Sequence, residues 1–414
     1  MRCSSVIYYC LLGGLILNAV YTFFYQRDLE LIVTEDAHGW YTKLNFIGDL
    51  LISVAAILSH YKYRNQFPKF VIISYWLLLF LVVVANWGTY SIYFTSPASF
   101  YNTKGIGTYL NLGILFAAAN LRYISKIQKL FLLITITFTV LGLMSLASVG
   151  MGFNRQDMLF KVREYANYLV YVFPFFFLRH REKKWQNILY YVFFVGVLVI
   201  ILSTASRSYI IVFFLVLAAK LYYQFSHSIR ENAYLLLALV IIFTFGINYL
   251  MESSFYNSFS SIIDIIEERA ADDTRSEQFE EFFRQYDASN LLFGVGPSGT
   301  YYSSNVGGQY GSFDNQFILL GWWAGLPALL VYILLLVRSM LRTYSPQRSF
   351  PDKESVKMAK WCIFLWILAA GGLAIWVSIS SHLYNYFDSL CIGLATFRAK
   401  KRFNLPAAGE YQAA

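Results

Sequence analysis

The chain has 414 residues, of which 57% are hydrophobic and only 14% are charged, and its formal net charge is +9. Soluble domains carry about 25% charged residues, so this composition excludes a water-soluble globular fold and is typical of a membrane protein. The positive charge follows from membrane orientation, as argued below, and requires no nucleic-acid partner.

Apolar segments that are suited to cross a bilayer as helices recur along the whole chain. They predict an all-α polytopic membrane protein with about twelve transmembrane helices, near residues 6–25, 44–60, 70–94, 105–121, 130–150, 166–178, 186–203, 209–225, 234–250, 314–337, 361–378 and 386–397. The first segment is longer than a typical signal peptide and has no small-residue cleavage site behind it, so we expect a transmembrane helix there. The chain then divides into helices one to nine (1–250), a large loop (251–313), helices ten to twelve (314–397) and a tail (398–414).

Lysine and arginine are distributed unevenly between the two sides of this arrangement. If the N-terminus is cytoplasmic, more than two thirds of the 33 basic residues fall in cytoplasmic segments, whereas most acidic residues fall elsewhere. The bias of lysine and arginine sets membrane orientation. We therefore expect both termini in the cytoplasm and loop 251–313 on the outer side.

The large outer loop carries signs of order. Isoleucines at 262, 263, 265 and 266 have helical spacing, which predicts an amphipathic helix at the membrane surface. Thr274 and Glu277 have the spacing of a capping box, so a second helix is expected from about 274 to 286. The glycine-rich stretch 293–299 cannot continue that helix.

Basic residues on the outer side depart from the orientation rule and are candidates for binding an anionic group. Arg207 lies in the short turn 203–208, Arg269 and Arg275 lie in the large loop, and Arg163 precedes the sixth predicted helix. An arginine at the membrane surface suits a lipid-linked phosphate. Surface ion pairing and contact with lipid headgroups remain the alternatives for each of them.

Taken in order, these motifs resemble the bacterial O-antigen polymerase and O-antigen ligase superfamily. The resemblance rests on the Ser206–Arg207 pair, Arg275 at a helix start, the GVG of 294–296 and DNQFILLGWWAG at 314–325, and it covers best residues 186–340. It implies a multi-pass protein of the bacterial inner membrane with a periplasmic active site. The implied activity is a metal-independent glycosyl transfer from glycans carried on undecaprenyl diphosphate.

One position favours the polymerase branch. Ligase-like members usually place a histidine before the asparagine that opens the span after the large loop, whereas here Asp314 precedes Asn315 and the loop contains no histidine. A polymerase transfers the growing chain onto the next lipid-linked repeat unit and releases undecaprenyl diphosphate. A ligase acting on lipid A core and a lipid-linked oligosaccharide flippase or transporter remain alternatives. A transporter usually places its charged site near the bilayer midplane, where this chain offers chiefly Asp49, with Asp388 near the start of the last span.

We expect Arg207 and Arg275 to bind the donor diphosphate, since the planar guanidinium can make two hydrogen bonds to phosphate. Asp314 is the candidate base for the acceptor hydroxyl, although it also suits a helix N-cap and the loop offers other acids. The further candidate substrate-binding residues are Arg269, Arg163, Asn315, Tyr301 and Tyr302. The sequence has no metal-binding motif, so we expect neither metal nor cofactor. The expected partners are the lipid-linked glycan, the bilayer, a chain-length regulator and a flippase.

Overall fold

The computed structural model describes residues 3–35, 40–101, 104–148, 155–179, 184–204, 207–225, 280–281, 284–285, 287–303, 307–311, 316–341, 353–371 and 383–397. Most of these residues are helical, and β1 (Tyr301–Ser303) and β2 (Gly308–Tyr310) form a short antiparallel pair in which Tyr301 faces Tyr310. The expectation of an all-α architecture is therefore confirmed at this coarse level.

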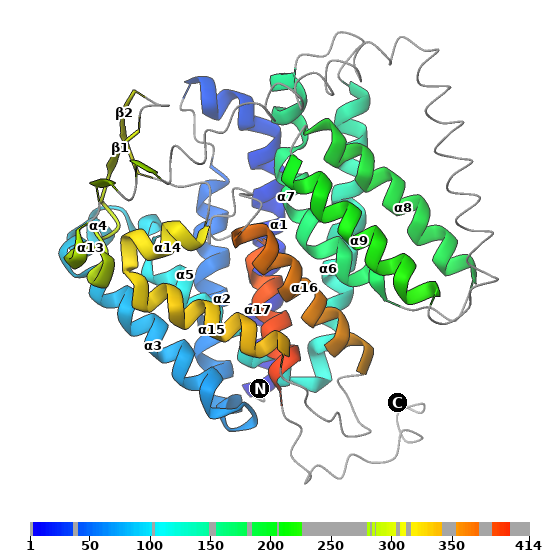
Figure 1. Cartoon of the computed structure of the whole chain (residues 1–414). Helices are drawn as coiled ribbons and strands as arrows, with labels where there is room; N and C mark the ends of the chain where they lie inside the picture. Colours follow the sequence, from blue (N-terminus) through cyan, green and yellow to red (C-terminus); the bar gives the residue numbers. More distant parts are fainter. Residues whose placement is uncertain are drawn as a thin grey trace.

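The longer helices pack into one bundle (Figure 1). They are α1 (Cys3–Glu35), α2 (Thr42–Tyr63), α3 (Lys69–Ala85), α6 (Leu121–Ser148), α7 (Arg155–Leu178), α8 (Lys184–Ser203), α9 (Arg207–Phe225), α15 (Leu326–Leu341), α16 (Lys353–Gly371) and α17 (Leu383–Thr396). Shorter helices connect them: η1 (Arg64–Gln66), η2 (Trp87–Thr89), α4 (Tyr90–Thr95), η3 (Pro97–Tyr101), α5 (Ile106–Asn111), η4 (Leu112–Ala119), α13 (Ala288–Phe293) and α14 (Gln316–Ala324).

Several helices have the length and composition of membrane spans. Three described segments, Cys3–Leu29, Thr42–Gln66 and Arg122–Ser148, are long and apolar enough to cross a bilayer, and further helices are apolar but shorter. Large apolar side chains such as Ile73 and Phe80 on α3 and Val192 on α8 face outward, as contact with lipid requires. These features suit a membrane protein, but the number of twelve spans is not confirmed. The predicted ninth span, 234–250, lies outside the described residues.

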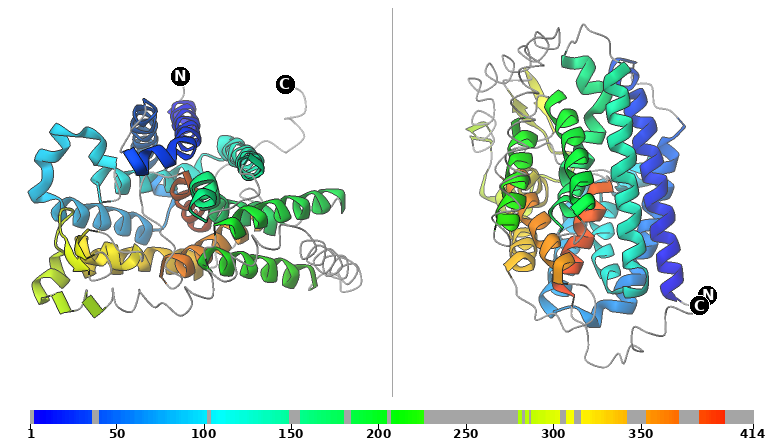
Figure 2. Two further views of the ribbon diagram at one scale, coloured as in Figure 1. Left: turned by 90° about the horizontal axis from the view of Figure 1, so that it is seen from above. Right: turned by 90° about the vertical axis from the view of Figure 1, so that its right-hand side faces the viewer.

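Helix α7 lies at the centre of the bundle. It packs against α1, α6, α8, α9, α16 and α17, and α1, α6 and α7 run side by side (Figure 2). Every residue of α7 from 164 to 178 is buried, because the sequence from 168 onward is apolar on all sides of the helix and Glu164 and Asn167 are hydrogen-bonded within the bundle. The predicted sixth span, 166–178, is therefore the deeply buried part of a longer helix.

The predicted tenth span, 314–337, is not one continuous helix. It is divided into α14 and α15 at Gly325, whose φ is 86°. A Cβ at this position would lie 2.4 Å from the carbonyl oxygen of Leu292, so only glycine allows the chain of α13 to pass so close. Similarly, α3 ends at Ala85, well short of the predicted end at 94, and the chain continues through η2 and α4.

Polar contacts between helices join ends that the charge pattern places on the same side. At one end, Lys62 donates to Ser4, Asn120 Nδ2 donates to the carbonyl oxygen of Ser4 at 3.1 Å, and Lys220 Nζ donates to that of Arg179 at 3.0 Å. The β1–β2 pair lies at the opposite end from the start of α1 (Figure 1). These contacts bring together residues that the charge pattern assigns to one side, and the orientation of the bundle in a membrane stays a prediction.

Candidate functional site

The structure describes only some of the predicted site residues. Arg269, Arg275, Asp314 and Asn315 lie outside the described residues, and Arg207 is the first residue of α9. Arg163 is half-buried on α7, Tyr301 is buried in β1, and Tyr302 is 52% exposed. The described part of the predicted site therefore consists of Arg163, the start of α9 and the β1–β2 pair.

Arg163 belongs to a polar cluster built from four helices. We call it the Arg163 cluster, and its members are Gln26 on α1, Arg163, Glu164 and Asn167 on α7, Tyr209 on α9 and Tyr384 on α17.

Hydrogen bonds tie three of these helices together. The Glu164 backbone N–H donates to Gln26 Oε1 at 2.5 Å, Asn167 Nδ2 donates to Glu164 Oε2 at 3.4 Å, and the Tyr209 hydroxyl donates to Asn167 Oδ1. Gln26, Glu164 and Asn167 are each at most 8% exposed, so their polar groups must be paired inside the bundle. The cluster is thus a built, buried feature of the fold.

Arg163 is placed close to the start of α9 by the packing of α7. Asn167, one helical turn after Arg163 on α7, accepts a hydrogen bond from Tyr209 of α9. Tyr209 stands two residues after Arg207, in the first turn of α9. The first turn of α9 also carries the positive end of the helix dipole. The structure therefore brings Arg163 to the end of α9 at which Arg207 stands.

The glycine motif at 294–296 is fixed against the turn between α14 and α15. Val295 N–H donates to the carbonyl oxygen of Trp322 at 2.9 Å and Gly296 N–H to that of Trp323 at 3.0 Å. Gly294 has a φ of 73°, and a Cβ there would lie 2.4 Å from the Trp323 oxygen. Glycine is therefore required at 294 both for its backbone conformation and for this close approach.

Lys104, which the sequence analysis did not single out, holds the same segment from the other side. Its Nζ donates to the carbonyl oxygens of Pro297 at 3.1 Å and Gly311 at 2.6 Å, and it lies 4.9 Å from the centre of the Trp322 ring. Burial lowers the pKa of Lys104 to about 8. A lysine on the expected outer side departs from the orientation rule, and this signal could have identified it.

The two predicted tyrosines have different environments. Tyr301 is 3% exposed and packs edge-on against Trp322, with ring centres 5.8 Å apart. Tyr302 exchanges hydrogen bonds with Gln285, its N–H donating to Oε1 at 2.9 Å, and its side chain is accessible. Tyr301 therefore supports the fold of the loop, and Tyr302 has the exposure that binding a sugar requires.

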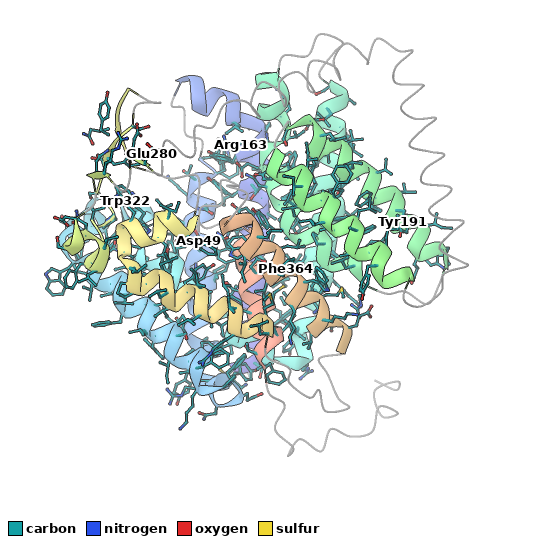
Figure 3. All side chains as sticks on the ribbon, in the orientation of Figure 1. Asp49, Arg163, Tyr191, Glu280, Trp322 and Phe364 are labelled. Carbon is teal, nitrogen blue, oxygen red and sulfur yellow. The ribbon has the colours of Figure 1, made fainter. Side chains whose placement is uncertain are left out.

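A second buried polar network lies deeper in the bundle, around Asp49 (Figure 3). The Tyr386 hydroxyl on α17 donates to Asp49 Oδ1, and Ser53 Oγ donates to Asn111 Oδ1 at 2.6 Å. Ser53 also shares a hydrogen bond of 3.0 Å with the Tyr101 hydroxyl. These contacts join α2, α5, η3 and α17.

Within the described part of the chain, no three His, Cys, Asp or Glu side chains are grouped as a metal site would need. No family model, curated protein or solved structure matches this chain.

Proposed function

We propose that this chain is a polysaccharide polymerase of the O-antigen type in the bacterial inner membrane. It joins undecaprenyl-diphosphate-linked repeat units at the periplasmic face. The observation that carries the proposal is the Arg163 cluster, which sets a half-buried arginine beside the end of α9 that begins with Arg207. Both arginines belong to the side that the orientation rule leaves poor in basic residues.

The reaction needs a site for negative charge on the leaving group. The bond from the anomeric carbon to the diphosphate oxygen breaks, its electron pair leaves with undecaprenyl diphosphate, and an acceptor hydroxyl forms the new glycosidic bond. Arg163 and Arg207 would bind the diphosphate, because two guanidinium groups and the start of α9 together offer positive charge and N–H donors. Arg275 joins them in this proposal by its position in the motif.

The hydroxyl proton must pass to a base. Asp314 remains our candidate, since it directly precedes Asn315 and α14 in the sequence. Lys104 and the 294–296 motif fix the segment 294–311 over the turn that follows α14. Tyr302, Arg269 and Asn315 would contribute contacts to the sugar or the phosphate. Each group that is held in place lowers the entropic cost of bringing donor and acceptor into the reactive geometry.

The flippase alternative has one observation in its favour. Asp388 is buried within α17 at 6% exposure, and acids inside a bundle often mark transport pathways. The ligase alternative differs from the proposal only in its acceptor.

The test uses purified full-length protein and one synthetic undecaprenyl-diphosphate repeat unit, with products separated on a gel. A ladder of products supports the polymerase. Transfer only to added lipid A core would replace it with the ligase, and unchanged substrate would favour the transporter.

Variants locate the site in the same assay. Arg163→Ala and Arg207→Ala should each lower the rate by about 10²–10³-fold, as loss of a preorganised charge-stabilising group does. Arg163→Lys should restore only part of the rate, because lysine keeps the charge but not the two-pronged geometry. Arg27→Ala is the matched control, since Arg27 is an exposed arginine next to Gln26 that pairs with Asp28 at 2.7 Å. Equal activity of the Arg163 and Arg27 variants would remove the Arg163 cluster from the site.

A further inference from the structure

A small internal cavity of about 30 Å³ lies among α5, α15, α16 and α17. Its polar lining consists chiefly of Thr108, Asn111, Tyr332, Asn385, Asp388 and Ser389. The space suits one water molecule or one desolvated ion and is far too small for a sugar. It is therefore separate from any site for the glycan.

Asp388 is the charged group of this cavity. It is 6% exposed, and neither carboxyl oxygen has a hydrogen-bond partner within the part of the chain that the structure describes. Among the described residues that line the cavity there is no lysine, arginine or histidine. An ionised carboxylate without a partner is very costly in a bundle surrounded by lipid, so its charge must be neutralised there.

The neighbouring acid has a partner of its own. Asp49 accepts from the Tyr386 hydroxyl, and Asn111 Nδ2 lies 3.4 Å from the Asp49 carbonyl oxygen, so this network holds Asp49 in place from α17 and α5. Asp388 is the only acid among the described residues that line the cavity. One negative charge is thus available for a ligand in the cavity.

The groups around the cavity are oxygen donors suited to a hard cation. The Ser389 hydroxyl donates to the Asn385 carbonyl oxygen at 2.9 Å, and the Tyr332 hydroxyl accepts from Trp366 Nε1 at 3.1 Å, so both oxygens keep a free lone pair. A single carboxylate with neutral oxygens suits a monovalent ion better than Ca²⁺ or Mg²⁺, which usually take more than one carboxylate or several waters.

We propose that this cavity binds one Na⁺ ion, with Asp388 as its anionic ligand. A protonated carboxyl group would remove the charge without an ion, and the second test below distinguishes these two cases. The ion would join α17 to α5 and α15, which contribute the lining oxygen groups of Thr108, Asn111 and Tyr332. The proposal does not depend on the polymerase activity.

Direct binding is the first test, on purified full-length protein in detergent. Radioactive sodium should bind at about one ion per chain, and Asp388→Asn should weaken this binding at least tenfold, because the amide keeps the shape but not the charge. Asp28→Asn is the control, since Asp28 is an acid near the end of α1 that pairs with Arg27 outside the cavity. Sodium binding that is unchanged in Asp388→Asn would overturn the proposal.

A second measurement needs only the wild-type protein and so does not depend on the folding of a variant. The melting temperature should rise to a plateau with NaCl but not with choline chloride at equal ionic strength, because a ligand of the folded state alone stabilises it. An infrared band of a protonated carboxylic acid that persists in saturating NaCl, without any Na⁺-specific rise in melting temperature, would show that a proton neutralises Asp388 and would refute the Na⁺ site.

Discussion

Replacing Lys104 with methionine tests how the 294–311 segment is held in place. Methionine has a similar length and keeps the apolar stem, but it removes the two hydrogen bonds to Pro297 and Gly311 and the cation over Trp322. Hydrogen bonds from a charged donor contribute about 1.5–3 kcal/mol each. Lys104 is partly exposed, so we take the lower value for both bonds and subtract about 1 kcal/mol for desolvation of the ammonium. The net loss is about 2 kcal/mol, which corresponds to about 30-fold more frequent opening of the segment.

Hydrogen exchange followed by mass spectrometry measures this opening. Amides in the β1–β2 pair should exchange about 30-fold faster in Lys104→Met, whereas Val295 and Gly296 should keep their protection through their bonds to Trp322 and Trp323. Lys43→Met is the control, because Lys43 is an exposed lysine in the first turn of α2. A change of less than about threefold in Lys104→Met, or an equal change in the control, would refute the reasoning.

Two further predictions concern packing and protonation. Gly393→Ala should strongly destabilise the protein in a thermal unfolding assay, because its Cβ would lie 2.0 Å from the Leu115 carbonyl oxygen, whereas Gly88→Ala, with no atom within 4 Å, should not. Competitive acylation, which reacts only with the free amine, measures the protonation of Lys104. Since the pKa of Lys104 is lowered to about 8, the assay should show this lysine half deprotonated near pH 8, whereas ordinary lysines reach this point at about 10.4. An ordinary lysine titration at Lys104 would contradict this prediction.

The sequence predicted which segments are apolar helices but not where they break. Average hydropathy treats 314–337 as one span because the residues around Gly325 are apolar. The break depends on a positive φ at Gly325 and on the backbone of Leu292, which packs against Gly325. Leu292 lies more than 30 residues earlier in the sequence, so local hydropathy does not include it. Hydropathy also began the sixth span at 166, after Glu164, since it cannot show that Glu164 is hydrogen-bonded to Gln26 and Asn167 inside the bundle.

The orientation rule identified Arg163 and Arg207 as unusual, and the structure brings the helices that carry them together at one end. It did not reveal Lys104, although the same argument applies to it. The partners of Lys104 are carbonyl groups 193 and 207 residues away, and any residue type could supply them. A sequence pattern therefore cannot predict such contacts, because every residue has a backbone carbonyl group whatever its side chain is.

Helix α17 connects the two buried polar regions of the bundle. Tyr384, which belongs to the Arg163 cluster, and Asp388, in the cavity, are four residues apart and so lie on the same face of the helix, one turn from each other. The Tyr384 ring packs against the Tyr171 ring, with ring centres 5.0 Å apart. The position of Tyr384 along the bundle axis depends on the contacts that hold α17. A cation at Asp388 would hold α17 against α5 and α15 one helical turn from the Arg163 cluster. The proposed ion site would then help to keep Tyr384 in position within that cluster.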